Sequence, residues 1–375
     1  MRPLLIGLNS ASEQYTPLEL IERGLGAHRA GFDSFWISDH FHPWFHTGGH
    51  SSFAWEVIAA MSARSDRLVM GTSVTAPLFR YNPAIVAQAF STLSYLAPGR
   101  IWLGMATGEG LNEVPCGYKW PSPHAERIRR LREATIVIRL LWTKEFITFN
   151  GEYYNLNEAN LYDKPQIPIP IHISAFGPRS AELAGELGDG LMTVGPMDPT
   201  RAREVLFPAV ERGAKLSGRR FDDIEKSIVL GLGFHADREK AIDALLPWRG
   251  SMLPEFADSE IHDPRVIEEK GKSVGRDSIE KHMIVATSAE DVISAVDRHV
   301  RLGFDHIGLA LSGDLPAFLD AAKEKILPYF REEYKDRRFD GEYRGRYDWE
   351  NLRRLLEAKD LGQKVRLSGQ PPNLP

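Results

Sequence analysis

The chain has 375 residues, 43% hydrophobic and 26% charged, with a formal net charge of −5; this is typical of a globular enzyme and excludes the polycationic composition of nucleic-acid-binding proteins. No apolar stretch approaches the roughly 20 residues that a membrane helix needs, so we expect no membrane partner either. The chain has a single cysteine, Cys116, which excludes an internal disulfide framework and a cysteine metal site. The apolar run at the N-terminus is too short to match a signal peptide. We therefore expect a cytoplasmic protein.

Short apolar runs alternate along the chain with longer segments of helical periodicity, which is the pattern of βα units around a parallel sheet. Strands are expected at residues 4–8, 34–37, 68–72, 101–105, 171–174, 190–194, 228–234 and 306–311. Helices are expected at residues 17–30, 54–64, 83–96, 123–142 and 181–187, with a hairpin over 147–156. Eight strands are the number of a closed barrel, so the predicted fold class is α/β, a TIM (β/α)8 barrel.

Two segments interrupt this alternation. Residues 247–281 are too long for an ordinary connection, and we expect them to form a helical insertion over the C-terminal mouth of the barrel. Residues 334–375 are dense in charged side chains, with one helix candidate at 349–358 and a proline-rich end. We expect this charged appendage to be partly disordered and to be either a solvated tail or a clasp on a second subunit. The barrel domain then covers residues 1–333.

The most informative motif follows the expected strand at residues 34–37, where Asp39, His40 and Trp44 come in quick succession. In α/β barrels the loops at the C-terminal strand ends line the mouth that carries the chemistry. His40 is therefore the leading candidate for a general base, because an imidazole ordinarily titrates near pH 6.5 and can take up a proton near neutrality. The alternative is a histidine that only caps a hydrogen bond at a strand end.

Three further motifs fall at expected strand ends. The run Gly-Thr-Ser-Val-Thr-Ala-Pro after the third strand is small and hydroxylated, which lets a planar ligand lie against the backbone. After the fourth strand, Gly108 allows close backbone approach, while Glu109 and Asn112 offer an acid and an amide. Gly177 and Pro178 open a helix whose free amides suit a phosphate group. Together these features suit a flavin-like redox cofactor.

These motifs resemble those of the luciferase-like barrels, within the branch that uses the deazaflavin coenzyme F420. The matching stretches are residues 12–15, 38–44, 71–74, 80–84, 108–113 and 188–190. They look like that branch's glucose-6-phosphate dehydrogenases and its secondary alcohol dehydrogenase, and the resemblance runs from about residue 6 to residue 330. It implies coenzyme F420 as the cofactor, a small-molecule substrate and a homodimer.

The resemblance also implies roles for individual residues. The residues that contact the deazaflavin are expected to be Asp39, Ser73, Val74, Thr107, Gly108, Glu109, Asn112, Gly177 and Pro178. His40, Trp44 and Glu109 are expected to surround the reacting carbon, and the peptide bond between Ser73 and Val74 is expected to be cis.

A deazaflavin has carbon where a flavin has N5, so it accepts hydride at C5 and does not readily activate oxygen. This implies an oxidoreductase that acts on CH–OH donors. His40 is expected to remove the hydroxyl proton of the substrate. Trp44 either donates its indole N–H to the developing alkoxide or only forms a wall of the pocket. Glu109 either delivers a proton to the reduced ring or only hydrogen-bonds the cofactor.

The resemblance is weaker for the substrate. Lys270 matches one cation of the phosphate-binding cluster of the glucose-6-phosphate enzymes, but Pro196 or Met197 stands in the place of a lysine and His282 in that of an arginine. Each charge-assisted hydrogen bond contributes roughly 1.5 to 3 kcal/mol, so phosphate binding is expected to be weakened. The expected substrate-binding residues are Trp44, Trp248, Lys270 and His282. A sugar, a sugar phosphate and a secondary alcohol all remain open.

Two other functions compete with this interpretation. The same barrel supports an FMN-dependent monooxygenase that works with a flavin reductase, and the fold does not separate the two. A non-catalytic F420-binding protein would keep the phosphate anchor but would need no base. A metal site is not expected, because His42, His46 and His50 have no accompanying carboxylate pair or cysteine.

Overall fold

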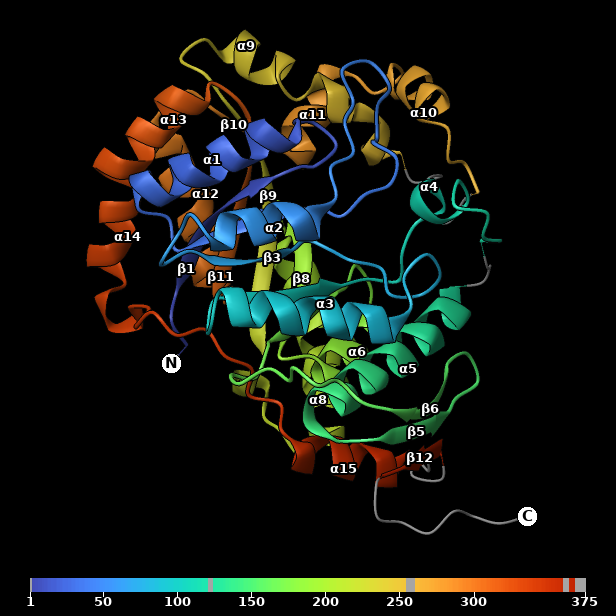
Figure 1. Ribbon diagram of the computed structural model, residues 1–375. Helices are drawn as coiled ribbons and strands as arrows, with labels where there is room; N and C mark the ends of the chain where they lie inside the picture. The colour runs from blue at the N-terminus through green and yellow to red at the C-terminus, as the bar shows by residue number, and fades with distance from the viewer. Residues whose placement is uncertain (1, 121–123, 254–259, 360–363, 368–375) are drawn as a thin grey trace.

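The computed structural model describes residues 2–120, 124–253, 260–359 and 364–367. Within them, eight parallel strands form a closed barrel (Figure 1). The strands are β1 (Leu5–Ser10), β2 (Ser34–Ile37), β3 (Val69–Thr72), β4 (Ile101–Met105), β7 (Ile171–Ser174), β8 (Gly190–Gly195), β9 (Glu225–Phe234) and β11 (His306–Gly313). They pair in the order β9, β11, β1, β2, β3, β4, β7, β8, and the pairing of β8 with β9 closes the barrel. The predicted TIM barrel is confirmed.

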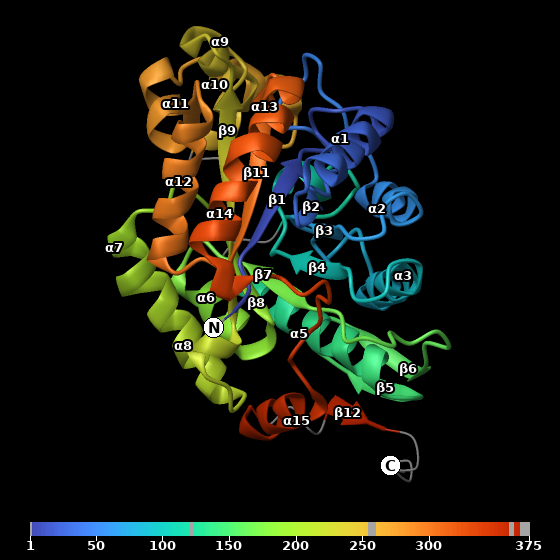
Figure 2. The same cartoon turned by 90° about the vertical axis from the view of Figure 1, so that its left-hand side faces the viewer.

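Helices surround the barrel on its outer face, as the two perpendicular views show (Figures 1 and 2). They include α1 (Pro17–Ala30), α2 (Ala54–Ser62), α3 (Pro83–Leu96), α5 (His124–Thr143), α6 (Pro178–Leu187), α8 (Phe207–Leu216), α12 (Ala289–Leu302), α13 (Leu315–Ala321) and α14 (Leu327–Glu333). Local sequence sets the ends of α1: Thr16 and Glu19 form a capping box, and Gly31 ends the helix at a φ of 99°. The expected start of the fourth predicted helix, at Pro123, lies outside the described residues.

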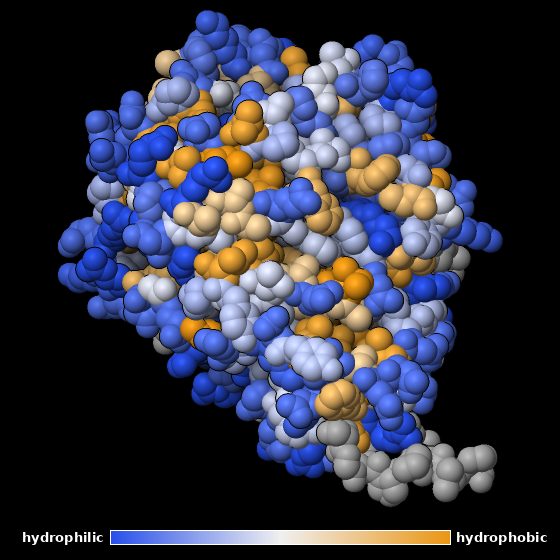
Figure 3. Space-filling model, in the orientation of Figure 1, coloured by the Kyte–Doolittle hydropathy of each residue, from blue (hydrophilic) through white to orange (hydrophobic). Residues whose placement is uncertain are grey.

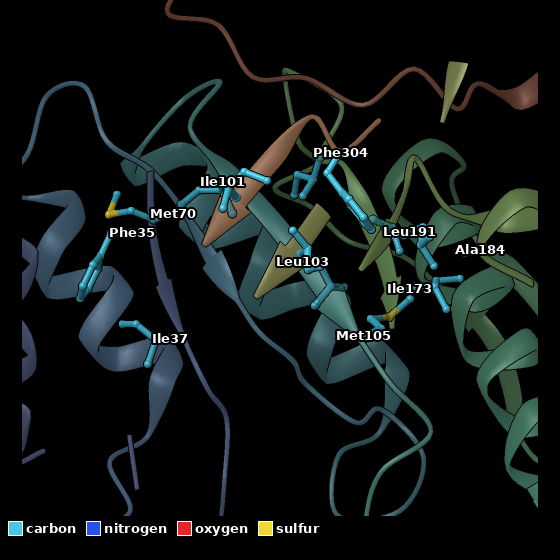
Figure 4. Close-up of a cluster of buried hydrophobic side chains, with 14 of the residues drawn as sticks. Phe35, Ile37, Met70, Ile101, Leu103, Met105, Ile173, Ala184, Leu191 and Phe304 are labelled. Carbon is cyan, nitrogen blue, oxygen red and sulfur yellow. The ribbon is translucent and has the colours of Figure 1, made fainter. Parts of the chain in front are cut away.

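Alternate residues of the strands face two different cores. Phe35 and Ile37 of β2 point to the layer between strands and helices, where they join the main core cluster with Met70 and Leu103 (Figure 4). Trp36, between them, faces the barrel interior instead. A Cβ on Gly7 would lie 2.6 Å from the indole nitrogen of Trp36, so glycine makes room for this ring. The two-residue period of a strand thus separates the two cores.

The described residues of the predicted charged appendage pack against the barrel. Tyr343 is buried and closes the N-terminal end of the barrel, where its hydroxyl donates a 2.6 Å hydrogen bond to Glu225 and lies 3.0 Å from Nε2 of His172. The predicted helix at 349–358 is present as α15 (Trp349–Ala358). The chain then adds β12 (Val365–Arg366) to the hairpin of β5 (Ile147–Asn150) and β6 (Asn155–Ala159). Residues 360–363 and 368–375 of the appendage lie outside the described residues.

The segment predicted as an insertion is helical where the structure describes it. It contains η3 (Leu246–Met252), α10 (Pro264–Gly271) and α11 (Arg276–His282), and residues 254–259 lie outside the described residues. These elements follow α9 (Arg238–Asp243) and precede β10 (Ile284–Ala286), an extra parallel strand beside β9. Among the helices described, none is long and apolar enough to cross a membrane.

Candidate active site

Three titratable side chains meet at the C-terminal end of the barrel. Glu13 follows β1, His40 follows β2 and Glu109 follows β4. Nε2 of His40 lies 3.4 Å from Oε1 of Glu13 and 3.8 Å from Oε2 of Glu109. The Glu13 side chain is 3% exposed, the His40 side chain 12% and the Glu109 side chain 36%. The same ring nitrogen therefore faces a deeply buried carboxylate and a carboxylate whose side chain is partly accessible from the mouth.

Backbone and amide contacts orient the ring of His40. Oδ1 of Asn112 accepts hydrogen bonds from the amides of Phe41 and His42, which directs its Nδ2 toward Nδ1 of His40 at 3.3 Å. Nδ1 also lies 3.1 Å from the carbonyl oxygen of His42. Nδ1 therefore faces one acceptor, the His42 carbonyl, and one donor, the Asn112 amide, while Nε2 faces the Glu13 carboxylate.

Glu109 has the properties of a group that can hold a proton for a ligand. Its Oε2 atom is buried and has no hydrogen-bond partner among the described residues. Burial raises the pKa of Glu109 above its ordinary value, with a further contribution from the negative charge of Glu13, although His40 and Arg80 act in the opposite direction. Oε2 is therefore enclosed by protein on the side of His40, whereas the exposed part of the side chain comes from its other atoms.

Trp44 is held between two elements at the mouth. Its ring centroid is 6.1 Å from that of His40, and it packs on Leu111 of α4 (Gly110–Glu113) and on Ile267 of α10. The Trp44 loop is also tied to the insertion, because Oε2 of Glu268 accepts 2.8 Å hydrogen bonds from the backbone amides of His46 and Thr47. The insertion therefore fixes one wall of the site beside His40.

Asp39 lies beneath the site and binds protein groups on both of its carboxylate oxygens. Oδ2 accepts a 2.7 Å hydrogen bond from Thr75, and Oδ1 accepts bonds from Arg80 and Tyr81 at 3.1 and 3.0 Å. Arg80 also pairs with Glu113, whose pKa burial raises to about 7 in spite of this partner. In this arrangement the Asp39 side chain joins the loops that follow β2 and β3, and its contact with a cofactor stays a prediction.

The strand ends beside these residues offer a surface for a planar ring. The Ser73–Val74 peptide bond is cis, as the resemblance implies, and Asn9 donates a 2.8 Å hydrogen bond to the Ser73 hydroxyl. Gly108 has a φ of 75°, a conformation that glycine adopts readily. At the ends of β7 and β8, the side chains of Phe176 and Val194 are 56% and 47% exposed. A bound ring would cover this exposed apolar surface.

The remaining predicted cofactor residues lie at the same end of the barrel. Thr107 follows β4, and its hydroxyl is 3.4 Å from Nε2 of His124. Gly177 is the N-cap of α6 and Pro178 is its first residue. No atom lies within 4 Å of the place where a Cβ on Gly177 would be, so the helix N-terminus is open to a ligand. Together with the exposed side chains of Phe176 and Val194, these features fit a planar cofactor that carries a phosphate.

Of the predicted substrate residues, Trp44 lies in the loop after β2, and the other three lie on separate elements of the insertion. Trp248 of η3 packs edge-on against Phe45, with ring centroids 5.4 Å apart. Lys270 and His282 are exposed and lie on α10 and α11, and Nδ1 of His282 is 2.7 Å from the Ser278 carbonyl of its own helix. Glu13 was not among the predicted site residues, although its position shortly after a strand is the same signal that identified His40. The described residues contain no cluster of three histidine, cysteine or acidic side chains that could hold a metal ion.

Sequence and structure comparisons establish the family of the chain. Residues 5–306 match the family model described as luciferase-like monooxygenase. The chain belongs to this family. It is 40% identical over 332 residues to a protein of Intrasporangium calvum named F420-dependent glucose-6-phosphate dehydrogenase, and 37% identical over 333 residues to a protein of the same name from Microbacterium testaceum. Each comparison covers 88% of this chain and 99% of the relative.

Solved structures share this fold. An F420-dependent secondary alcohol dehydrogenase in complex with an F420–acetone adduct has a TM-score of 0.83 and 36% sequence identity, covering 86% of this chain and 98% of that protein. A coenzyme F420-dependent tetrahydromethanopterin reductase from Methanopyrus kandleri has a TM-score of 0.72 at 19% identity, covering 88% of this chain and 99% of that protein. At that identity, the likeness of the reductase concerns the fold.

Proposed function

We propose that this chain is an F420-dependent dehydrogenase that oxidises the CH–OH group of a sugar, a sugar phosphate or a secondary alcohol. The observation that carries the proposal is the position of His40, with Nε2 3.4 Å from Glu13 and 3.8 Å from Glu109 at the mouth of the barrel. The names of relatives at 37–40% identity, and of the secondary alcohol dehydrogenase at 36%, support it.

The residues at the strand ends would hold the cofactor. When bound, coenzyme F420 supplies a ring that accepts hydride at C5. The backbone at Ser73, Val74 and Gly108 would lie against this ring, and the open N-terminus of α6 at Gly177 and Pro178 would bind its phosphate. The side chains of Thr107 and Asn112 complete the proposed set, although Asn112 already orients His40.

His40 would act as the general base toward the substrate hydroxyl. Proton uptake at Nε2 gives an imidazolium 3.4 Å from the Glu13 carboxylate, and its Nδ1–H would donate to the His42 carbonyl. Charge that develops on the ring is therefore compensated by groups already in place. Trp44, 6.1 Å from His40 between ring centroids, would close the pocket beside the reacting hydroxyl.

Glu109 would hold a proton beside the same ring nitrogen of His40 that Glu13 faces. Burial raises the pKa of Glu109, and its side chain is partly exposed at the mouth, so the protonated carboxyl could donate to a bound group. Two carboxyl groups of different environment beside one histidine can carry different protonation states at one pH. Glu13 would stay the charge partner of His40 while Glu109 supplies or receives the second proton.

Three positions match the phosphate-binding cations of the glucose-6-phosphate enzymes, and only Lys270, exposed on α10, is a lysine or arginine in this chain. Pro196 follows a cis peptide bond at the end of β8, and the Met197 amide donates to Nε2 of His299. We therefore propose that unphosphorylated alcohols or sugars are used better than glucose 6-phosphate, with Lys272 and Lys281 as the alternative cations for a phosphate.

The assembly is proposed from the resemblance to be a homodimer in the cytoplasm. Exposed apolar side chains support an interface on the face shown in Figure 3, where hydrophobic residues are visible over α1 and α3. Leu18 of α1 is 76% exposed, and Ile85 and Leu96 of α3 are also exposed. Larger exposed apolar patches are typical of surfaces that bind another protein.

Binding titrations of the purified protein with coenzyme F420 and with FMN test this assignment. We expect tight binding of F420 and weak binding of FMN. The His40→Ala variant should bind F420 as the wild type does but should lose turnover, because the base is absent while the ring slot is intact. Binding of FMN alone would instead support a two-component monooxygenase, and unchanged turnover of His40→Ala would remove His40 from the mechanism.

A further inference from the structure

A second cavity lies at the N-terminal end of the barrel, opposite the mouth that carries His40. Its volume is about 590 Å³, within the range of small-molecule sites. Its walls come from the first residues of β1, the C-terminal end of α1, helix α14 and residues 337–341 of the tail. None of the residues proposed for the dehydrogenase reaction lines it. The cavity is therefore separate from the candidate active site.

Positive charge dominates the lining of this cavity. Its described lining includes five arginines, which are Arg29, Arg67, Arg331, Arg337 and Arg338, but only two aspartates. Arg29 and Arg338 are exposed and form no hydrogen bond or ion pair with any residue of the described ranges. Arg337 alone among the five has a short ion pair, 2.7 Å to Asp305.

The other two arginines bond to backbone carbonyls. Arg331 donates a 2.6 Å hydrogen bond to the carbonyl of Gly31, and Arg67 donates one of the same length to the carbonyl of Phe32. Burial lowers the pKa of Arg67, and the like charge of Arg331 adds to this effect although Asp33 and Asp66 oppose it. The guanidinium charges are thus only partly neutralised by the protein, and an anion in the cavity would complete their neutralisation.

One side of the cavity is apolar and partly aromatic. Phe330 of α14 and Phe339 of the tail line it, together with Leu327. Phe339 is held in place by the buried Tyr343, with ring centroids 6.4 Å apart, and Phe330 is stacked on Tyr334 at 6.1 Å. Aromatic walls next to arginine forks are suited to a ligand that has both a ring and a polyanionic group.

We propose that this cavity binds an organic phosphate of mononucleotide size, with its phosphates on the arginines of the rim and its ring against Phe339. Several guanidinium forks favour a di- or trianionic phosphate over a single carboxylate. The volume accommodates a ring and a sugar phosphate together. The tail supplies Arg337, Arg338 and Phe339, so it would contribute a ligand site as well as closing the barrel.

Isothermal titration of the full-length protein with ADP, inorganic pyrophosphate and adenosine tests the proposal without any F420. The test variant is the double substitution Arg29→Glu and Arg338→Glu, which changes exposed side chains that have no partner among the described residues. The matched control is Arg203→Glu, an exposed arginine of the segment before α8 that does not line the cavity. Circular dichroism confirms that each variant is folded.

We expect saturable binding of ADP to the wild type and to Arg203→Glu, and binding about 100-fold weaker to the double variant, because two charge-assisted contacts become repulsive. ADP should bind more tightly than pyrophosphate and than adenosine, since the site recognises phosphate and ring together. Equal binding of ADP by wild type and double variant would overturn the proposal. So would no binding of ADP, or binding of pyrophosphate or adenosine as tight as that of ADP.

Discussion

Replacing Glu13 by glutamine should slow catalysis strongly while leaving the fold and the cofactor site intact. Glu13 is 2% exposed, its Oε1 lies 3.4 Å from Nε2 of His40, and its Oε2 accepts hydrogen bonds from the hydroxyls of Ser12 and Ser38. Glutamine has nearly the same shape and keeps one carbonyl acceptor for the serine hydroxyls. What it removes is the negative charge that faces the imidazolium formed when His40 takes a proton.

The expected loss of kcat/KM follows from the contact between Glu13 and His40. A hydrogen bond to a charged partner contributes about 1.5 to 3 kcal/mol, and each 1.36 kcal/mol is a factor of ten. If Glu13 stabilises the imidazolium only as it forms, kcat/KM should fall by about 10- to 150-fold. The dissociation constant of F420 should change little, because none of the predicted cofactor residues changes.

Initial rates of F420 reduction at saturating cofactor, together with an F420 binding titration, measure both quantities. Glu22→Gln is the matched control, since Glu22 is an exposed carboxylate on α1 away from the mouth, and its kcat/KM should equal that of the wild type. Full activity of Glu13→Gln would refute the role of the charge. A loss of activity matched by an equal loss of F420 affinity would show that Glu13 instead supports the binding site.

Three further predictions concern Glu109 and the N-terminal end of the barrel. Burial raises the pKa of Glu109. If catalysis needs the protonated form of Glu109, the wild-type rate should fall as pH rises through that pKa. The pH–rate profile of Glu109→Gln should lack this fall. Tyr343→Phe removes the 2.6 Å hydrogen bond to buried Glu225 and should lower the free energy of unfolding by about 2 kcal/mol in urea titrations. An unchanged free energy of unfolding would contradict the role of Tyr343 in closing the barrel. Burial lowers the pKa of His172 from 6.5 to about 4, so only the unfolded chain takes up this proton between those values. Stability should therefore drop by up to about 3 kcal/mol from pH 6.5 to pH 4, and His172→Gln should lose that part of the slope.

The sequence predicted the barrel because its strands are continuous apolar runs. The expected bounds at residues 34–37, 101–105 and 171–174 agree with β2, β4 and β7. The prediction for β9 began three residues late, at 228 instead of Glu225. Glu225 and Ser227 are polar, so the local pattern ended there, but they are buried against His306, His172 and the tail. Such partners come from distant parts of the chain and leave no local signal.

In the candidate site too, local sequence patterns could be read, whereas contacts between distant parts of the chain could not. His40 and Glu109 could be predicted because each follows a strand within a few residues, and the structure brings them within 3.8 Å. Glu13 was missed because the first strand was predicted to end at residue 8, whereas β1 continues to Ser10 and places Glu13 at the mouth. The packing of Tyr343 could not be predicted, since a charged composition predicts a solvated tail and does not reveal which tyrosine reaches a buried carboxylate.

The absorbance of coenzyme F420 tests the dehydrogenase activity when purified protein is mixed with the cofactor and isopropanol, glucose or glucose 6-phosphate. We expect loss of the F420 absorbance with at least one of these alcohols, no loss in His40→Ala, and a faster loss with an unphosphorylated substrate than with glucose 6-phosphate. Tight binding of F420 with no change of absorbance for any secondary alcohol, sugar or sugar phosphate would contradict a dehydrogenase and leave a non-catalytic F420-binding protein.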